Sequence, residues 1–342
     1  MLRLLLALLL LAPVGAAAQE TVVRIGTARS VSNGAELFAI EKGYFKEHNI
    51  KVEIELLDSS ANAIALLAQG RLDMIAGGIS AGYFNALEKN LPVTMALDRV
   101  SSPLGHNLML RPDHKGQITR LSQLKGKTIA TNGSGAVSTY EVGKMLETEG
   151  LKISDVDVKV FPFTQMALAF NNKAIDAAIV IPPFVSQFLD QGHAVAFAAP
   201  DDLVQPAPMT IAVIMVNTDW AAKNPDVLRN YYTAYLRGVR DYCNAYHGAP
   251  IKDEIIAALI KHGSERRPEL LHKYPWPARS PNGRVNMASM LDMQDWYVAN
   301  KLSTAKLPPE KLLDLSYADY ANKKLGPFAL ANKDSKTPGC RE

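Results

Sequence analysis

The chain has 342 residues, with 37 basic and 34 acidic side chains and a formal net charge of +3 at pH 7. Lysines and arginines are scattered singly or in pairs, so the sequence offers neither a basic stripe for nucleic acid nor a basic run for a membrane surface. Nucleic-acid partners are therefore not expected, and the length predicts two lobes around separate hydrophobic cores.

Residues 1–18 have the pattern of a secretory signal peptide. Arg3 supplies the positive charge, residues 4–11 the apolar core, and Ala16-Ala17-Ala18 a small-residue cleavage site. The apolar core has about half of the roughly 20 residues that a membrane span needs. Gln19 follows in place of a cysteine, so no lipidation site is present there. We expect a soluble, periplasmic mature protein that begins near Gln19.

Strands and helices alternate in the first part of the mature chain. The pattern predicts strands at 22–25, 52–57 and 74–79, with helices at 37–43 and 61–69 between them. Nearly continuous apolar strands separated by helices are typical of a parallel sheet with helices on both faces.

The same order returns further along the chain. Strands are predicted at 128–131, 156–161 and 177–181, and helices at 137–149 and 165–171. Asp73 and Asp176 occupy matching helix-to-strand turns at a constant offset of 176 − 73 = 103 residues. We interpret both aspartates as partners in turn hydrogen bonds and not as a site.

The remainder of the chain contains one more predicted strand, at 210–216, followed by helices at 225–246, 251–262, 286–300 and 309–314. The chain is predicted to pass between the lobes near 107–110 and near 209–214, which makes a two-strand hinge. Lobe one would then comprise 19–107 and 212–342, and lobe two 108–211. The predicted fold class is α/β, with two lobes.

Three segments resemble a known family. They are 39–45 followed by the strand at 52–57, 67–73 before Gly77-Gly78, and 121–130 before Gly133-Ser134. Their order resembles the nitrate, sulfonate, taurine and thiamine-precursor family of ABC-transporter substrate-binding proteins, over residues 21 to about 216. The resemblance implies a type II-like periplasmic binding protein fold with a ligand cleft between its lobes. It also implies a monomer that serves a membrane-embedded permease with a cytoplasmic ATPase.

Ligands of open parallel sheets bind beyond the carboxyl ends of the strands, where helix N-termini present unpaired amides. Loops at these positions carry hydroxyls, amides and glycines, although capping, turn formation or core packing would also explain them. Residues 132–136 form the strongest candidate, as an anion-binding nest of backbone amides. The candidate ligand-binding residues are Arg29, Ser32, Asn33, Ser59, Ser60, Gly78, Ser80, Asn132, Gly133, Ser134, Gly135, Thr164 and Pro183.

These residue types favour a small organic anion, such as a sulfonate or a carboxylate. The seven histidines lack zinc-ligand spacing, and no nucleophile, base and orienting group stand in a recognisable arrangement. We expect neither a metal, nor a cofactor, nor catalysis. Two alternatives remain: a pyrimidine-binding or synthase-like enzyme of the thiamine-precursor type, and a ligand-sensing domain of a receptor.

Four further features lie outside the candidate site. Asp98-Arg99 is interpreted as a surface pair, and Tyr83 and Tyr140 as ligand contacts or packing residues. Cys243 and Cys340 are predicted to form a disulfide, because export permits it and the polar tail around Cys340 lacks apolar anchors.

Overall fold

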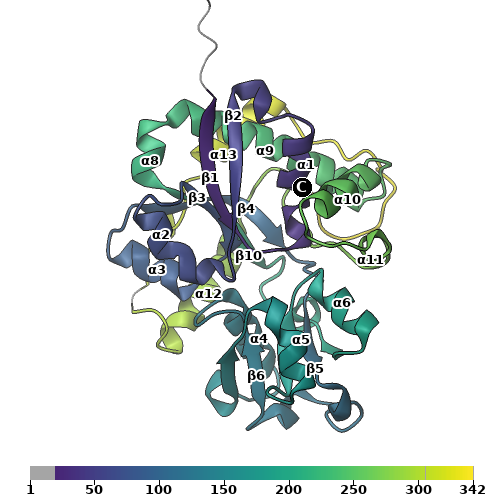
Figure 1. Cartoon of the computed structure of the whole chain (residues 1–342). Coiled ribbons are helices and arrows are strands. Elements are labelled where there is room, and N and C mark those ends of the chain that lie inside the picture. The colour runs from purple at the N-terminus through teal and green to yellow at the C-terminus, as the bar shows by residue number, and fades with distance from the viewer. Residues whose placement is uncertain (1–19, 305, 342) are drawn as a thin grey trace, which may run out of the picture.

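The computed structural model describes residues 20–304 and 306–341, so the predicted signal peptide lies outside the described residues. The molecule has two lobes, which lie one above the other in Figure 1, and each lobe is built on one five-stranded sheet. We call the half built on the first sheet lobe one and the half built on the second sheet lobe two. This architecture confirms the predicted two-lobed α/β fold.

The sheet of lobe one has the order β2-β1-β3-β10-β4. Its first three strands are parallel, whereas β10 runs antiparallel to both of its neighbours. The strands are β1 (Thr21–Thr27), β2 (Ile50–Leu56), β3 (Met74–Gly78), β4 (Val93–Ser101) and β10 (Thr210–Asn217). The helices between them are α1 (Gly34–Glu41), α2 (Ile64–Ala68), preceded by a 3-10 turn at Ser60–Ala63, and α3 (Ala81–Glu88).

The sheet of lobe two repeats this plan with the order β7-β6-β8-β5-β9. Strands β6, β7 and β8 are parallel, and β5 runs antiparallel to β8 and β9. The strands are β5 (Asn107–Leu110), β6 (Thr128–Thr131), β7 (Asp157–Val160), β8 (Ala177–Val180) and β9 (Val195–Ala198). The helices are α4 (Val137–Glu147), α5 (Phe163–Asn171), α6 (Phe184–Gln191) and α7 (Pro200–Leu203).

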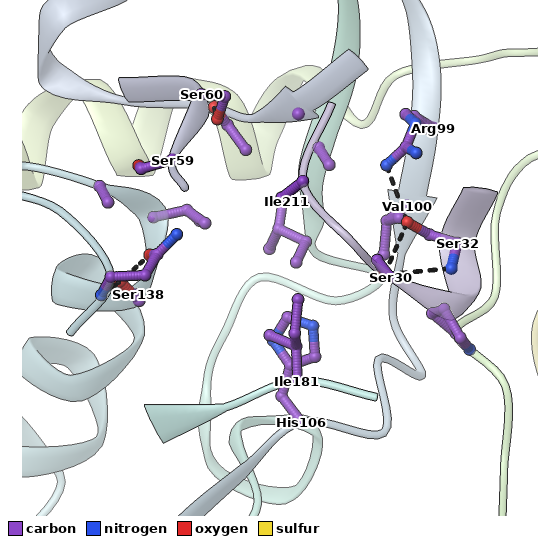
Figure 2. Close-up of a pocket in the computed structure, with 18 of the residues that line it drawn as sticks. Ser30, Ser32, Ser59, Ser60, Arg99, Val100, His106, Ser138, Ile181 and Ile211 are labelled. Carbon is purple, nitrogen blue, oxygen red and sulfur yellow. Dashed lines mark hydrogen bonds between the residues drawn. The ribbon is translucent and has the colours of Figure 1, made fainter. Parts of the chain in front are cut away.

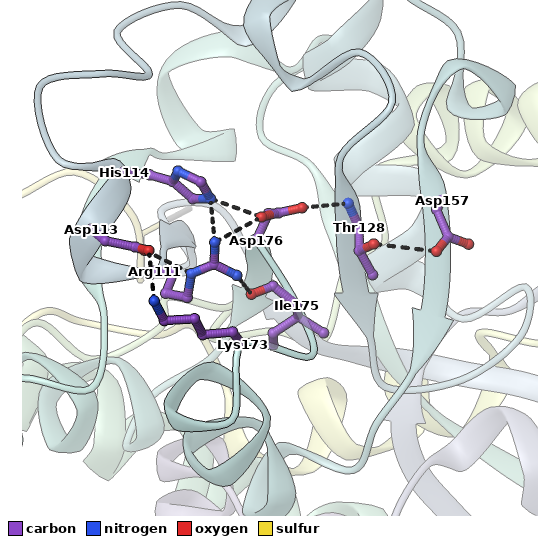
Figure 3. Close-up of polar contacts among 8 residues, drawn as sticks. All are labelled: Arg111, Asp113, His114, Thr128, Asp157, Lys173, Ile175 and Asp176. Carbon is purple, nitrogen blue, oxygen red and sulfur yellow. Dashed lines mark hydrogen bonds and ion pairs between the residues drawn. The ribbon is translucent and has the colours of Figure 1, made fainter.

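The matching aspartates have the same role in each lobe. The Asp73 carboxylate accepts a hydrogen bond from the backbone amide of Arg24, 2.8 Å away, and the Asp176 carboxylate accepts one from the amide of Thr128 at 2.9 Å. Each carboxylate therefore bonds the neighbouring strand, at the fourth residue of β1 and at the first residue of β6, and among the described residues neither is hydrogen-bonded to its own turn. Asp176 also contacts His114 and Arg111 (Figure 3). Their interpretation as structural residues agrees with these contacts.

The C-terminal helices mostly cover lobe one. Helix α9 packs against α1 and α13, and α10 packs against α1. The predicted helix at 309–314 is wrong, because only Pro309–Lys311 forms a 3-10 turn, and the helix lies at 316–325 instead. These helices are α8 (Thr218–Lys223), α9 (Pro225–Tyr246), α10 (Lys252–Lys261), α11 (Pro268–Lys273), α12 (Met287–Ala299) and α13 (Ser316–Leu325).

Two chain segments cross between the lobes, one from β4 to β5 and one from β9 to β10. They lie side by side, since the Ser102 amide donates to the Met209 carbonyl at 3.0 Å and the Met209 amide donates to Ser102 Oγ at 2.7 Å. Helix α12 lies near α4 of lobe two in Figure 1 and makes a third connection. Its Asp292 accepts a hydrogen bond from the Tyr140 hydroxyl of lobe two at 2.7 Å.

The predicted disulfide is not present, because Cys243 and Cys340 are both free thiols in the buried core. The two side chains are neighbours, and burial together with Cys340 raises the pKa of the Cys243 thiol. Noncovalent contacts hold the tail: the ring nitrogens of His247 hydrogen-bond to Ser335 Oγ at 2.8 Å and to the Gly339 carbonyl at 3.0 Å. The C-terminal tail is therefore held to α9 by hydrogen bonds of His247, which its composition does not indicate.

The contact between α1 and α9 depends on Gly238. A Cβ at this position would lie 2.4 Å from the Ala35 carbonyl oxygen, so one helix has to move. We expect Gly238→Ala to lower the free energy of unfolding by about 1–3 kcal/mol. The matched control is Gly82→Ala in α3, whose new Cβ has its nearest neighbour at 3.5 Å. It should be neutral or stabilising by up to about 1 kcal/mol. Urea denaturation measures both, and equal effects would contradict the packing argument.

Candidate ligand-binding cleft

A cavity of about 80 Å³ lies between the lobes and is lined by residues of both. Its walls include residues that follow β1, β2, β6, β7 and β8 and the last residues of β3, which place it at the carboxyl ends of the parallel strands in each sheet. This is the position where open α/β sheets bind ligands. Figure 2 shows the cavity with side chains of both lobes directed towards it.

Hydroxyl groups form the wall contributed by lobe one. Ser30 and Ser59 each cap a short 3-10 turn through the side-chain oxygen, which accepts from a backbone amide two residues ahead. Ser32 Oγ donates to Ser30 Oγ at 2.9 Å, and Ser60 Oγ donates to the Gly78 carbonyl at 3.2 Å. Ser30 and Ser59 therefore cap turns, as capping was expected for loop residues of this kind, and also line the cavity.

Arg99 is a buried cation in the same wall. Its Nη1 donates to Ser32 Oγ at 2.8 Å, its Nη2 donates to Asn33 Oδ1 and to Thr27 Oγ1, and its Nε has no partner among the described residues. No carboxylate is hydrogen-bonded to it among these contacts. Burial lowers the pKa of Arg99 from its usual value, which measures how costly the charge is at this site.

Asp98 and Arg99 are not a surface pair, because they are 0 % and 3 % exposed. Pairing between β10 and β4 joins Val213 to Asp98 and Ala212 to Val100, so Arg99 is the extra residue of a β-bulge. Bulges interrupt the alternation of side chains and often direct one into a site. Strand β4 is buried along nearly its whole length, so both successive charged residues lie in the interior.

Further charges lie beneath Ser32. Arg279 donates to the Ser32 carbonyl at 2.8 Å and stacks over the Tyr242 ring, 3.9 Å from its centroid. Burial raises the pKa of Glu36, and burial raises the pKa of Asp98 to about 6 despite hydrogen bonds that oppose the shift. The two guanidinium groups of Arg99 and Arg279 thus lie close enough to the Glu36 carboxyl to oppose this rise in its pKa.

Lobe two supplies a different wall. Glu141 lies in α4, and its Oε1 is hydrogen-bonded to His106 Nδ1 at 2.8 Å. Its Oε2 has no hydrogen-bond partner among the described residues. Ser138 Oγ donates to Asn132 Oδ1 at 2.7 Å. Phe163 closes this side and stacks on Phe184 with a centroid separation of 5.8 Å. The wall combines an acid, an amide and an aromatic surface.

The structure brings some of the predicted residues to the cavity and places others elsewhere. Arg29 and Thr164 are exposed and line a separate small hollow beside Asp58 and Phe184. Tyr83 and Tyr140 are packing residues of the core. The predicted residues that line the cavity are Ser32, Ser59, Ser60, Gly78 and Asn132.

The other predicted residues surround the cavity without lining it. Asn33 is buried as an acceptor for Arg99, and Ser80 is buried as the cap of α3. Ser134 is exposed, and Pro183 is buried behind Pro182, which lines the cavity. Gly133 and Gly135 are buried against lobe one, as described next.

Glycines form the seam where the lobes meet. The Gly135 carbonyl accepts from the Ala81 amide of lobe one at 2.9 Å. A Cβ on Gly133 would lie 2.8 Å from Ser59 Oγ, and a Cβ on Gly78 would lie 2.7 Å from Val137 Cγ1. The nest predicted at 132–136 therefore touches the opposite lobe, and the absence of side chains allows the cleft to close.

The sequence interpretation missed Ser30, Arg99, His106, Ser138 and Glu141, all of which line the cavity. Ser138 and Glu141 are three residues apart in α4, a spacing that puts two side chains on one face of a helix. This pattern just after the 132–136 loop was a usable signal. Nothing in the sequence around Arg99 or His106 indicates a turn towards a cleft.

The described residues contain no group of three histidine, cysteine, aspartate or glutamate side chains that could hold a metal ion. Within the same ranges, no helix is both long and apolar enough to cross a bilayer.

A family model described as NMT1/THI5 like matches residues 33–246. None of the curated proteins compared with the chain matches it in sequence. Solved structures match over nearly the whole chain, although their low sequence identities limit the comparison to the fold.

The nitrate-binding protein NrtA from Synechocystis PCC 6803 has a TM-score of 0.75 at 14 % identity, covering 94 % of this chain and 92 % of its own. The alkanesulfonate-binding protein SsuA from Xanthomonas axonopodis pv. citri, bound to MOPS, has a TM-score of 0.69 at 15 % identity, covering 87 % and 97 %. The desulfurization enzyme DszB has a TM-score of 0.60 at 11 % identity, covering 89 % and 100 %. The fold thus serves binding proteins and an enzyme.

The seam predicts an effect on closure. Gly78→Ala would place a methyl group against Val137 of lobe two, so we expect it to shift the molecule towards an open form with a larger radius of gyration in small-angle scattering. Adding Val137→Ala removes the opposing methyl groups and should restore the compact form, with Val137→Ala alone as the control. An unchanged scattering curve for Gly78→Ala would refute the role of the seam.

The buried carboxyl of Asp98 predicts a dependence of stability on pH. Its pKa of about 6 in the folded chain exceeds the ordinary 3.8, so the folded state holds the proton more tightly than the unfolded state. As pH rises from about 4 to 6, wild type should lose about 3 kcal/mol of stability relative to Asp98→Asn, whose side chain does not titrate. Chemical denaturation at pH 4 and pH 7.5 measures this difference, and a constant difference would contradict it.

Proposed function

The chain belongs to the NMT1/THI5-like family, and from that premise we propose that it is the periplasmic receptor of an ABC importer, which captures a small organic anion between its lobes. A sulfonate or a carboxylate is the proposed ligand class. The proposed partners are a membrane-embedded permease with its cytoplasmic ATPase, to which a monomer delivers the ligand.

One observation carries the proposed ligand class. Arg99 lines the cavity, is 3 % exposed, and uses its hydrogen-bonding donors on neutral oxygens of Ser32, Thr27 and Asn33. A buried cation with no carboxylate hydrogen-bonded to it is costly, and an anion in the adjacent cavity would compensate it. The Ser59 hydroxyl, whose oxygen accepts from the Ala61 amide, would donate its hydrogen to an anion in the cavity.

The surroundings of His106 support a receptor rather than an enzyme. A hydrolase or transferase of the nucleophilic type needs a hydroxyl or thiol within hydrogen-bond reach of its base. Among the described residues, the hydrogen bond of the His106 ring goes to Glu141, and no serine or threonine hydroxyl bonds to it. A synthase-like enzyme acting on pyrimidines and a sensing domain remain the alternative functions.

Capture is proposed to follow from closure. The cavity takes walls from both lobes, and the two crossing segments pair at Ser102 and Met209, so a rotation about them would open the cleft to solvent. A ligand that contacts both walls would stabilise the closed form. The permease would then distinguish the closed, loaded receptor from the open one.

We expect binding of one ligand per chain without conversion. Screening sulfonates, carboxylates, nitrate and pyrimidines by thermal shift should give a rise in melting temperature with an anion, because a ligand that binds only the folded state stabilises it. Mass spectrometry should recover that ligand unchanged. A converted product would overturn the receptor proposal, and stabilisation by pyrimidines alone would favour the thiamine-precursor alternative.

Arg99→Met should lower affinity for the best anion of that screen by about 10- to 100-fold, since a hydrogen bond to a charged group contributes about 1.5–3 kcal/mol. Arg29→Ala is the matched control: this arginine is exposed, lies outside the cavity and should leave affinity unchanged. Isothermal titration with circular dichroism as a fold check measures both. Loss of affinity only in Arg29→Ala would place anion recognition on the 29–34 loop.

A further inference from the structure

We propose that the protein has a second ligand site, separate from the interlobe cavity, which binds a multivalent oxyanion such as a polycarboxylate or an organic phosphate. The site is a cavity of about 500 Å³, which we call the second cavity. Its lining residues come from the ends of β4 and β10, from both crossing segments, from the segment 279–286 and from the tail at 339–341. The inference goes beyond the proposed function and does not depend on the ligand of the interlobe cavity.

The second cavity lies behind the wall of the first. The two cavities share no lining residue among the described ranges. Val100 and Ile211 line the interlobe cavity, whereas their chain neighbours Ser101 and Thr210, which are paired in the sheet, line the second cavity. Successive side chains of a strand point to opposite faces of its sheet. The ends of β4 and β10 therefore separate the two cavities.

The lining carries positive charge. Its charged side chains are Arg279, Arg284 and Arg341, and no acidic side chain of the described residues lines it. Arg341 donates from Nε to the Thr337 carbonyl at 3.2 Å and from Nη2 to the Ser335 carbonyl. These backbone acceptors do not neutralise its charge. An anion bound between the guanidinium groups would be attracted by all three.

The carboxylates beside the second cavity already have partners. Asp98 accepts from Ser101 Oγ at 2.5 Å and from the Ser280 amide at 2.7 Å. Asp319 is ion-paired with Arg284 Nη2 at 2.7 Å, which uses one of the three nitrogens of that guanidinium. Neither carboxylate lines the cavity, so the arginines are the charged side chains that an occupant would contact.

Hydroxyl groups and a helix terminus add neutral donors. Ser102 Oγ accepts from the Met209 amide at 2.7 Å, and Ser280 Oγ accepts from the Arg284 amide at 2.9 Å. Neither hydroxyl donates to an acceptor among the described residues, so each has a hydrogen for a ligand oxygen. Helix α12 begins at the cavity with its cap residue Asn286, and the positive end of the helix dipole favours an anion there.

The volume and the spread of these donors indicate the class of ligand. A cavity of about 500 Å³ falls within the usual range for small-molecule sites, about 300–1,000 Å³. Its donors come from several chain segments, so an anion that contacts them has to carry more than one charged oxygen group. Guanidinium groups match the planar oxygen pairs of carboxylates and phosphates. The geometry thus favours a multivalent oxyanion over a halide or a single carboxylate.

Isothermal titration of the whole chain with citrate and with pyrophosphate, at constant ionic strength, tests the site. At least one of them should bind with a stoichiometry of one, and acetate should bind about 10-fold more weakly or less well still, because it can satisfy only part of the lining. Binding of citrate alone or of pyrophosphate alone would identify the recognised group as carboxylate or phosphate and would support the site. Binding of neither would overturn the proposal.

Variants locate the binding. Arg284→Gln and Arg341→Gln should each weaken binding of the better anion by about 10-fold, the lower end of the range for a hydrogen bond to a charged group. Arg229→Gln is the matched control: it removes the same charge from a partly exposed arginine that is ion-paired with Asp226 and lies outside the second cavity. It should bind the anion as wild type does. Equal losses in Arg284→Gln and Arg229→Gln would contradict a specific site.

Two further results separate the second cavity from the first. Arg99→Met should keep its affinity for citrate or pyrophosphate, and loss of that affinity with normal binding in Arg284→Gln would place the anion in the interlobe cavity and refute the proposal. Hydrogen exchange needs no variant: the anion should slow exchange of the amides at 280–286 and 339–341. Slowing confined to 30–32 and 132–138 would refute the second cavity while leaving the proposed function intact.

Discussion

The burial of Arg99 is the constraint on which the cleft depends. A guanidinium held away from water has to be satisfied by the protein, and here the oxygens of Thr27, Ser32 and Asn33 do so. Those three residues belong to the end of β1 and to the loop after it. The arginine therefore fixes the shape of this loop and, through Ser32, the orientation of Ser30. A single charge thus orders Ser30 and Ser32, half of the hydroxyl wall.

The loop that Arg99 orders also contacts lobe two, so the buried guanidinium is linked to the contact between the lobes. The Val31 amide donates to the Pro182 carbonyl at 3.3 Å, and the glycines at 78, 133 and 135 let the opposite surfaces approach. Backbone groups and small residues dominate this seam, so closing it requires few side chains to change rotamer. The glycine-rich loop after β6, predicted to be an anion nest, contacts the opposite lobe in the structure.

The sequence predicted the parts of the fold that periodicity and turn residues encode. The bounds of β6 and α9 were exact, because each is a continuous apolar or amphipathic run with clear ends. The site was harder to predict. Arg99 enters the cleft through a β-bulge, and the pairing of two distant strands decides where such a bulge forms. His106 meets Glu141 across 35 residues of chain. Cys243 and Cys340 are free thiols, and contacts of His247 that composition does not reveal hold the tail.

Helix α12 gives the molecule a control element that lies apart from the cavity lining. Its residues Asp292 and Trp296 bind Tyr140 and Glu147 of α4, and Trp296 packs so tightly on Gly143 that a Cβ there would lie 2.0 Å from the indole. Under the proposed closure, the strength of this docking would set the fraction of empty molecules that are already closed. Apparent affinity scales with that fraction, so substitutions in α12 would change how tightly a ligand binds without changing the residues that line the cavity.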